Sequence, residues 1–541
     1  MKTLVVIPAR GGSKGIPRKN VRFMAGRPLI SYAISCAKNS KNQFEVVVTS
    51  DDEEIKLVAS KYGAQIVDRP ASLAGDKITL DPVIYQAVEF METKKGYRYD
   101  YVITMQPTSP LLSVNTLDNA FDFFIANDFD TVISGVNDPR LSWRVENGIC
   151  IPNYSERVNR QYMKKDLKET GAFVISKRDF IKPTGRFGKK ISIYEMPERE
   201  AGDIDTPQDW WIAETELNKK NILIRVDGYS KIGMGHIYRG LQLAAGLIEH
   251  KVMFVISNKS DIGIEKINES HYPYKVISDN KEIIDIIEDF KADIVINDIL
   301  NTDVEYVKSL KSVGVRVVNF EDEGEGAQYA DAVINALYEK DNPERNTFYG
   351  SDYYLIRDEF VINSSNRRFS NHVNNILILF GGTDPCNLTN KTVHALLKLS
   401  NVHITVILGL GYNYYDEVVK LKENHDNFEI VQNVKMMSEF MGKADIAISS
   451  QGRTMLELAA MGVPTIIMSE NEREATHEFG TIKNGYLNLG SGLEVSENTI
   501  YETINWLIQC PQIRRNMSQQ MLEKDLLHGY DRVKKIVLGQ Q

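Results

Sequence analysis

Residues 4–20, LVVIPARGGSKGIPRKN, join an apolar run rich in β-branched residues to a glycine-rich, strongly basic loop. Further apolar runs at 44–50, 65–70 and 101–110 alternate with helical patterns. Alternation of strands with helices of about 10–15 residues predicts βαβ units and a mostly parallel sheet, so the expected fold class is α/β. Polar or glycine-containing segments follow each strand, at the edge where open α/β sheets bind ligands.

The same pattern starts again twice along the chain. A new strand and glycine loop, ILIRVDGYSKIGMGH, begin at residue 222, and ILILFGGTDP opens a third cycle at residue 376. The chain therefore divides into a first α/β domain and a second domain built from two Rossmann-like halves. We expect these parts to span residues 1–218, 221–365 and 374–541.

Composition and charge exclude several classes of protein. The 541 residues are 43% hydrophobic and 25% charged, as in an ordinary globular protein. No apolar run reaches the roughly 18 residues that a membrane span needs, and the four cysteines are scattered, so we expect a reduced, cytoplasmic protein. The net charge is +3 over residues 1–220 and −12 over the remainder, which argues against nucleic-acid binding through a basic face.

The basic loop is a candidate phosphate site. Seven basic residues and no acidic residue lie between Lys2 and Arg27, and glycines let backbone N–H groups approach an anion closely. A triphosphate would be bound by Arg10, Ser13 and Lys19, with Gly11 at the turn. The loop is not a Walker A motif, because no GK[ST] follows at the required spacing. The alternative interpretation is a solvated basic turn.

All nine histidines lie at or beyond His236, so the first domain cannot use imidazole chemistry. Asp203 and Asp205 would face one side of an extended segment, and paired carboxylates suit a hard cation such as Mg²⁺. The alternative is a cluster that caps the following helix, with Asp205 as the capping residue. The absence of histidine and the presence of the glycine loop favour metal binding.

Four segments of the first domain resemble the CMP-sialate synthetases, the cytidylyltransferases that activate nonulosonic acids. They are IPARGGSKGIPRKN, MQPTSPLL, NRQ with ETGAFVIS, and GDIDTPQDW, and the resemblance covers about residues 1–218. It implies CTP as substrate, Mg²⁺ on Asp203 and Asp205, and pyrophosphate stabilised by Arg10 and Lys19. It also implies a homodimer through this domain. The implied nucleotide contacts include Asn20, Thr79 and Gln106, with Asp81 beside them, and the implied acid-sugar contacts are Arg160, Gln161, Gly171 and either Arg140 or Arg144.

His236 is the candidate catalytic residue of the second domain. It follows the turn at Gly233 and Gly235 and stands at or near the start of a helix, where the helix dipole keeps an imidazole neutral and able to accept a proton. Arg239 follows one turn later and could orient a substrate or be structural. The alternative for His236 is an ordinary satisfied surface or core histidine.

The GMGHIYR context resembles the nucleotide-sugar hydrolase of pseudaminic acid biosynthesis, which is similar in fold to two-lobed (GT-B) glycosyltransferases. The segments IVINDIL, YYLIRDEF, ILILFGGTDPCNLT and ISSQGRTMLELAAMGVPTI extend the resemblance over about residues 221–490. It implies that His236 takes a proton from the attacking water, and that Asp298 and Arg239 contact the substrate. The implied nucleotide contacts are Gly452, Arg453, Thr454 and Glu457, and His477 is a further candidate.

The whole chain is thus predicted to be a bifunctional enzyme of nonulosonic acid biosynthesis. One domain would make a CMP-sugar of pseudaminic, legionaminic or sialic type from CTP, and the other would hydrolyse a UDP-2,4-diacetamido-2,4,6-trideoxyhexose. The expected partners are small-molecule substrates, with no nucleic acid and no membrane. Three alternatives remain: a C-terminal glycosyltransferase, a nucleotide-sugar-binding module, or another acid sugar such as a 3-deoxy-octulosonate.

Overall fold

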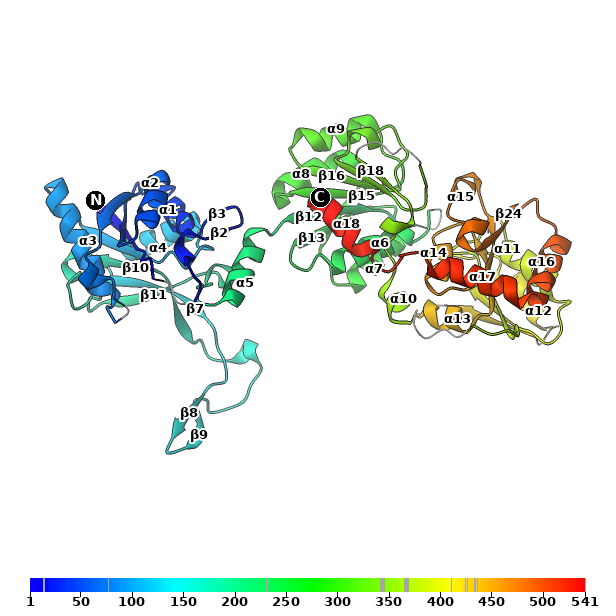
Figure 1. The fold of residues 1–541 in the computed structure, drawn as a ribbon, viewed down its shortest axis with the longest axis horizontal. Helices are drawn as coiled ribbons and strands as arrows, with labels where there is room; N and C mark the ends of the chain where they lie inside the picture. Colours follow the sequence, from blue (N-terminus) through cyan, green and yellow to red (C-terminus); the bar gives the residue numbers. More distant parts are fainter. Residues whose placement is uncertain are drawn as a thin grey trace. The chain divides into compact units, whose positions relative to one another are not determined.

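A computed structural model describes residues 1–12, 15–75, 77–229, 232–340, 346–363, 369–409, 411–423, 425, 427–432, 434 and 436–540. The chain divides into two compact units, Met1–Lys219 and Lys220–Gln541, called here the N-terminal and C-terminal units (Figure 1). Within the described residues, no helix is long and apolar enough to cross a membrane.

The N-terminal unit contains a seven-stranded sheet in the order β11-β7-β10-β6-β1-β4-β5. All neighbouring strands are parallel except β10, which runs antiparallel to both β6 and β7. The predicted α/β class with a mostly parallel sheet is confirmed. The strands are β1 (Thr3–Pro8), β4 (Glu45–Ser50), β5 (Gln65–Asp68), β6 (Tyr101–Met105), β7 (Thr131–Asn137), β10 (Leu167–Lys177) and β11 (Ile191–Glu195).

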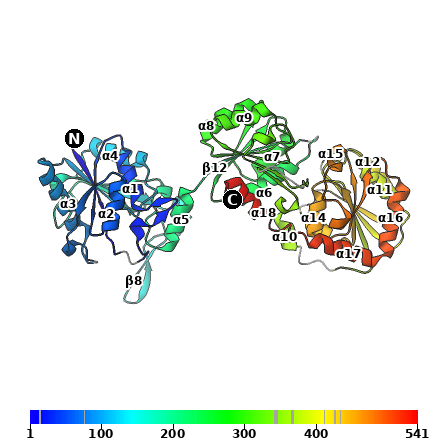
Figure 2. The ribbon, with the colours of Figure 1, turned by 45° about the horizontal axis from the view of Figure 1, so that its top comes forward.

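Helices cover both faces of this sheet, and every residue of its interior strand β1 is therefore buried (Figure 2). Val5 and Ile7 pack in one core cluster with α1 and α4, whereas Leu4 and Val6 pack in another with α3. A strand that is apolar on both faces requires cover on both sides. The helices are α1 (Ile30–Lys38), α2 (Glu53–Lys61), α3 (Leu80–Lys95), α4 (Val114–Ala126) and α5 (Pro207–Leu217).

Two small hairpins complete the N-terminal unit. The first, β2 (Phe23–Met24) with β3 (Arg27–Pro28), lies beside α5, because the Ala25 amide donates to Glu214. The second, β8 (Trp143–Glu146) with β9 (Ile149–Pro152), extends away from the sheet as an arm (Figure 1). Its apolar side chains are uncovered: Trp143 is 53% exposed and Val145 is 70% exposed.

The C-terminal unit contains two fully parallel sheets, ordered β14-β13-β12-β15-β16-β17-β18 and β21-β20-β19-β22-β23-β24. The strands of the first sheet are β12 (Asn221–Val226), β13 (Lys251–Ser257), β14 (Tyr274–Ile277), β15 (Ile294–Asp298), β16 (Arg316–Phe320), β17 (Ala332–Asn335) and β18 (Thr347–Tyr349). Those of the second are β19 (Asn375–Leu379), β20 (His403–Leu408), β21 (Phe428–Gln432), β22 (Ile446–Ser450), β23 (Thr465–Ser469) and β24 (Tyr486–Ser491). This pair of sheets agrees with the predicted two-lobed architecture.

The helices around the first sheet are α6 (Gly235–Ala245), α7 (Asp261–Glu269), α8 (Ile283–Phe290) and α9 (Val304–Ser312). Those that follow are α10 (Asp358–Asn363), α11 (Leu388–Leu396), α12 (Tyr415–Glu423), α13 (Met437–Lys443), α14 (Thr454–Ala460), α15 (Glu472–Ala475), α16 (Glu497–Gln509), α17 (Pro511–Leu522) and α18 (Gly529–Leu538). We expected residues 374–541 to form one lobe, but α18 returns to the first sheet. Its side chains Val533, Ile536 and Val537 join the core around β12 and α6, because they form the apolar face of this helix.

Candidate active sites

The glycine loop of the N-terminal unit leaves the carboxyl end of β1 and is fixed at both of its ends. The Asn20 side chain donates to the Arg10 carbonyl at 3.0 Å, and the Gly11 amide donates to Asp51 at 3.3 Å. A Cβ at Gly11 would lie 2.6 Å from a carboxylate oxygen of Asp52, so this close approach requires glycine. Ser13, the third predicted phosphate contact, lies outside the described residues.

Lys19 connects this loop to the aspartate segment near residue 205. Its side chain is only 12% exposed, and its Nζ donates to the Ile204 carbonyl at 2.6 Å and to Asp205 at 3.3 Å. Gly15 also approaches this segment, since a Cβ there would lie 2.5 Å from the Asp205 carbonyl oxygen. Two motifs nearly 190 residues apart in the chain thus meet at one edge of the sheet.

The two predicted metal ligands differ in their surroundings. Asp205 is 75% exposed, whereas Asp203 is half-buried and its Oδ1 has no hydrogen-bond partner. Burial raises the pKa of Asp203. Thr206, not Asp205, caps α5 in a reciprocal capping box with Asp209, so the capping alternative does not account for Asp203 or Asp205.

The orphaned oxygen of Asp203 is a suitable ligand for a hard cation, as is the exposed carboxylate of Asp205. Among the described residues, no group of three or more His, Cys, Asp or Glu side chains is arranged to hold a metal ion. An ion on these two aspartates would therefore need oxygen atoms from substrate or water to complete its coordination.

Gln106 and Gly171 lie next to Asp203. Gly171 has φ +73° at the irregular part of β10, where the register with β7 shifts. A Cβ at this position would lie 3.0 Å from Gln106 Nε2 and 3.8 Å from Asp203 Oδ2. The structure therefore brings together three of the four segments on which the family resemblance rests, and Gly171 lets them approach.

The predicted acid-sugar arginines lie on the exposed side of the unit. Arg160 pairs with Glu198 at 3.1 Å and with Asp138 at 3.5 Å, and Arg140 pairs with Asp138 at 2.8 Å. Arg144 lies on the β8–β9 arm, paired with Glu146. Side-chain hydrogen bonds from Arg140 and then Lys168 lower the pKa of Asp138. The roles of these arginines stay predictions, as do those of Gln161 and of Thr79, which are exposed; Asp81 pairs with Arg186.

Sequence reasoning missed Arg69, which directly follows β5. The side chain is buried and donates to the Thr49 carbonyl at 2.9 Å, whereas its Nε has no partner. Burial lowers the pKa of Arg69, and the neighbouring Arg10 charge acts in the same direction. A strand-end arginine beside a phosphate-type loop is the only local signal that could have identified it.

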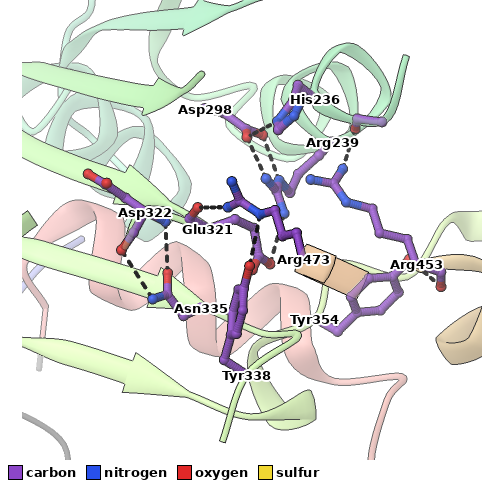
Figure 3. Close-up of polar contacts among 11 residues, drawn as sticks. His236, Arg239, Asp298, Glu321, Asp322, Asn335, Tyr338, Tyr354, Arg453 and Arg473 are labelled. Atoms are coloured by element: carbon purple, nitrogen blue, oxygen red, sulfur yellow. Dashed lines mark hydrogen bonds and ion pairs between the residues drawn. The ribbon is translucent and has the colours of Figure 1, made fainter. Parts of the chain in front are cut away.

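In the C-terminal unit, His236 is the second residue of α6 and is buried (Figure 3). Its Nδ1 lies 2.5 Å from Asp298 Oδ1, at the carboxyl end of β15. Burial lowers the pKa of His236 even though Asp298 acts in the opposite direction. The imidazole is therefore neutral over a wider pH range than usual.

Asp298 contacts Arg239 as well as the imidazole of His236. Arg239 Nε donates to Asp298 Oδ2 at 2.6 Å, its Nη2 donates to Oδ1, and its Nη1 donates to Glu321 at 3.1 Å (Figure 3). The Arg239 guanidinium and His236 hold the pKa of Asp298 well below its usual range, despite burial. Both Asp298 oxygens are thus engaged by protein groups, which favours an orienting role over the predicted substrate contact.

A cleft of about 330 Å³ lies between the two sheets of this unit. From the first-sheet side it is lined by Gly233, Gly235, Tyr238 and Arg239, and from the other side by Gly381, Gly382, Arg453, Thr454 and Glu457. Arg453 Nη1 donates to the Gly235 carbonyl at 2.5 Å, next to His236. Glu457 accepts from Arg357 at 2.9 Å, and burial raises its pKa.

The remaining predicted residues of this unit, Gly452 and His477, do not line the cleft. A Cβ at Gly452 would lie 2.9 Å from Glu474 Oε1, so glycine allows this contact. His477 is buried, with Nδ1 2.7 Å from the Gln451 carbonyl and its ring edge-to-face with Tyr338. His477 lines a separate, polar hollow rather than the cleft.

Residues 4–227 match the family model described as Cytidylyltransferase. A pseudaminic acid cytidylyltransferase from Campylobacter jejuni is 36% identical over 224 residues, which cover 39% of this chain and 93% of that protein. The chain belongs to the cytidylyltransferase family. The predicted resemblance of the N-terminal half is thereby confirmed, and this cytidylyltransferase carries further sequence that the C. jejuni protein does not match.

Residues 376–478 of the cytidylyltransferase match the model described as Glycosyltransferase family 28 C-terminal domain. A Helicobacter pylori protein named pseudaminic acid cytidylyltransferase and UDP-2,4-diacetamido-2,4,6-trideoxy-beta-L-altropyranose hydrolase is 24% identical over 511 residues, covering 89% of this chain and 91% of that protein. A Bacillus subtilis spore coat polysaccharide biosynthesis protein is 26% identical over 305 residues, covering 54% of this chain and 89% of that protein.

Proposed function

We propose that the N-terminal unit transfers CMP from CTP to a nonulosonic acid. The observation that carries this proposal is the meeting of the glycine loop, Lys19 and the Asp203–Asp205 segment at one sheet edge. The anomeric hydroxyl of the acid sugar gives its proton to solvent water as its oxygen forms a bond to the α-phosphorus, and the bond from that phosphorus to the pyrophosphate oxygen breaks. Arg10 and Lys19 stabilise the charge of the leaving pyrophosphate.

Asp203 and Asp205 would hold Mg²⁺ in this reaction. When bound, the ion offsets phosphate charge and orients the triphosphate. The chain's own contribution is to place the cations of Arg10 and Lys19 on the loop and the carboxylates opposite them. Lys19 joins the two groups, because it belongs to the loop and its Nζ donates to Asp205.

For the C-terminal unit we propose hydrolysis of a UDP-2,4-diacetamido sugar. His236 Nε2 accepts a proton from water, whose oxygen forms a bond to the anomeric carbon while the bond from that carbon to the UDP oxygen breaks. Asp298 supports this role, because an ionised carboxylate on Nδ1 leaves Nε2 as the proton acceptor. Arg453 and Thr454 bind the diphosphate, and Glu457 binds the ribose.

The second candidate for the C-terminal unit is a glycosyltransferase, favoured by the match of residues 376–478 to a glycosyltransferase family. The name and coverage of the H. pylori relative favour hydrolysis. The same relative supports a pseudaminic-type sugar in both reactions.

Two assays test these activities. Incubation with CTP, Mg²⁺ and a panel of nonulosonic acids, followed by mass detection of the CMP-sugar, tests the N-terminal unit. Folded protein that converts none of them would contradict the assignment. Incubation with the UDP-sugar and no acceptor tests the C-terminal unit, since free sugar and UDP appear only if water is the acceptor.

We also propose that the protein is a cytoplasmic homodimer, joined through the β8–β9 arm. The support is the exposed apolar surface on one face of the arm, where Trp143 and Val145 lie beside Cys150, since a monomer seldom leaves such side chains together in solvent. Trp143→Ser should shift the mass measured by light scattering from a dimer to a monomer. A wild-type protein that is monomeric at micromolar concentration would contradict the proposal.

A further inference from the structure

We infer that Arg473 is a positioning residue for the hydrolytic site, acting on His236 through Glu321, Arg239 and Asp298. The inference rests on the proposed hydrolysis. Arg473 lies on α15, which follows strand β23 of the second sheet, whereas His236 and the three residues through which Arg473 acts belong to the first-sheet half. Its effect therefore passes from the second-sheet half of the unit to the first-sheet half.

Arg473 donates two hydrogen bonds to the first-sheet half of the unit (Figure 3). Its Nη2 donates to the Glu321 carbonyl at 2.8 Å, and its Nε donates to the Tyr338 hydroxyl at 3.0 Å. Glu321 follows β16 and Tyr338 follows β17, so the guanidinium ties the ends of two adjacent strands. A planar guanidinium has donors in the fixed geometry needed for both bonds, and a lysine could make only one of them well.

Glu321 needs such support because its backbone is strained. Its φ is +49°, in the left-handed region, which costs roughly 1–2 kcal/mol for a residue with a side chain. The Glu321 amide donates to the Ile334 carbonyl at 3.0 Å, and its carbonyl accepts from Arg473, so the residue is held from both sides. This conformation directs a carboxylate that is 3% exposed onto Arg239.

From Glu321 the contacts continue without a gap to the imidazole. Glu321 Oε1 accepts from Arg239, Arg239 donates to both oxygens of Asp298, and Asp298 contacts His236 Nδ1. Every one of these side chains is buried, so none can exchange its partner for water at low cost. A shift of Glu321 therefore moves Arg239, and with it the carboxylate that fixes the tautomer and orientation of His236.

Glu474, the residue after Arg473, contacts the strand end that precedes the proposed nucleotide contacts at 452–454. Glu474 accepts from the Glu470 amide at 2.9 Å and is also hydrogen-bonded by the Gln451 backbone and the Ser450 side chain. Those groups directly precede Gly452 and Arg453. Helix α15 thus contacts this strand end through Glu474 and contacts Glu321 through Arg473. The nucleotide side therefore depends on Glu474, whereas His236 and its partners depend on Arg473.

The test compares Arg473→Gln and Arg473→Lys in the full-length protein, with Arg515→Gln as the control. Arg515 is an exposed arginine of the same unit that contacts Asn371, and its loss removes the same charge. We expect Arg473→Gln to lower kcat for UDP release by about tenfold to a hundredfold, because small misplacements of catalytic groups have effects of that size. Arg473→Lys should be intermediate. UDP affinity, measured by calorimetry, and cytidylyl transfer should change less than twofold.

A second readout needs no turnover. In the wild type, the His236 Nδ1 proton should give a slowly exchanging, strongly downfield NMR signal, because it is shared with a buried ionised carboxylate. The signal is assigned by its loss in His236→Gln. It should broaden or disappear in Arg473→Gln and persist in Arg515→Gln.

The two readouts separate failure of this inference from failure of the proposed function. A wild-type protein that releases no UDP from the sugar nucleotide overturns the proposed hydrolysis, and the NMR signal then tests the positioning alone. If the wild type turns over and Arg473→Gln keeps both its kcat and the Nδ1 signal, the positioning role is overturned while hydrolysis stands. A large loss of UDP affinity in Arg473→Gln would also overturn it, because the residue would then be a ligand contact.

Discussion

The glycine loop of the N-terminal unit and the His236 cluster of the C-terminal unit both lie at the carboxyl ends of parallel strands, but they balance charge differently. In the first, Asp205 is exposed and Asp203 has an oxygen without a partner, so both carboxylates can bind a charged ligand. In the second, His236, Asp298, Arg239 and Glu321 are buried and bonded to one another, so opposite charges are paired inside the protein, although Glu321 Oε2 has no hydrogen-bond partner. In a site for a highly charged triphosphate, the substrate and the ion complete the charge balance. In a site that activates water, the protein's own side chains must provide the charge balance.

The largest expected effect concerns the ion site. Asp203→Asn should lower cytidylyl transfer by about a thousandfold, since a metal ion contributes several kcal/mol and each 1.36 kcal/mol is tenfold in rate. UDP release should stay within twofold of the wild type. Both activities are measured on one preparation, with Asp179→Asn as a control that removes an exposed carboxylate paired with Arg98. Loss of both activities in Asp203→Asn would contradict the separation of the two sites.

The reciprocal variant is His236→Gln. Removal of a general base typically costs about a hundredfold to ten-thousandfold, so UDP release should fall by that factor while UDP still binds. Cytidylyl transfer should be unchanged, because the N-terminal unit contains no histidine. His403→Gln, which removes an imidazole paired with Glu429, is the matched control. Unchanged UDP release in His236→Gln would show that another group takes the proton.

The pH dependence should also differ between the two units. Burial lowers the pKa of His236, so the neutral, active imidazole persists to lower pH than an ordinary histidine with a pKa of about 6.5. UDP release should therefore reach half its maximum below pH 6.5 on the acid side. Burial raises the pKa of Asp203 in the ion-free protein, so protons should compete with Mg²⁺ for this carboxylate at a higher pH than they would for an ordinary aspartate. A half-maximum for UDP release at or above pH 7 would contradict the role of a buried neutral base.

The smallest expected effect is that of Gly171→Ala. Alanine at φ +73° costs roughly 1–2 kcal/mol, and its Cβ would press on Gln106. We expect cytidylyl transfer to fall about tenfold, with a lower thermal midpoint. Gly148→Ala is the control, because Gly148 has φ +79° with open space around it on the β8–β9 arm. Equal losses of activity in the two variants would mean that backbone strain, not the approach to Gln106, is responsible.

The sequence predicted the α/β class because strands and helices alternate, and every residue of β1 proved to be buried. It could not predict that β10 runs antiparallel, since a buried strand has the same hydrophobic pattern in either direction. The glycine loop and the Asp203 segment were predictable because their residue types suit phosphate and metal. The structure joins them through Lys19, a contact that no local pattern contains.

The interior of the His236 cluster was harder to predict. His236 and Arg239 stand out beside a glycine turn, but Glu321 and Arg473 look like ordinary charged residues after a strand. Their contact joins positions 152 residues apart, so its signal lies in the three-dimensional arrangement alone. Asp298 was identified as important, yet only the geometry shows that its oxygens are occupied by His236 and Arg239.

Helix α18 has a consequence for how the protein is made. Its residues Val533, Ile536 and Val537 complete a core whose first strand begins at Asn221, and Arg316 donates to the Val537 carbonyl across 221 positions. Because the ribosome delivers the chain from its amino end, β12–β18 emerge long before their last packing partner. That sheet must stay incompletely covered throughout synthesis of the whole intervening lobe, and nascent chains halted before residue 529 should bind chaperones that recognise exposed apolar surface.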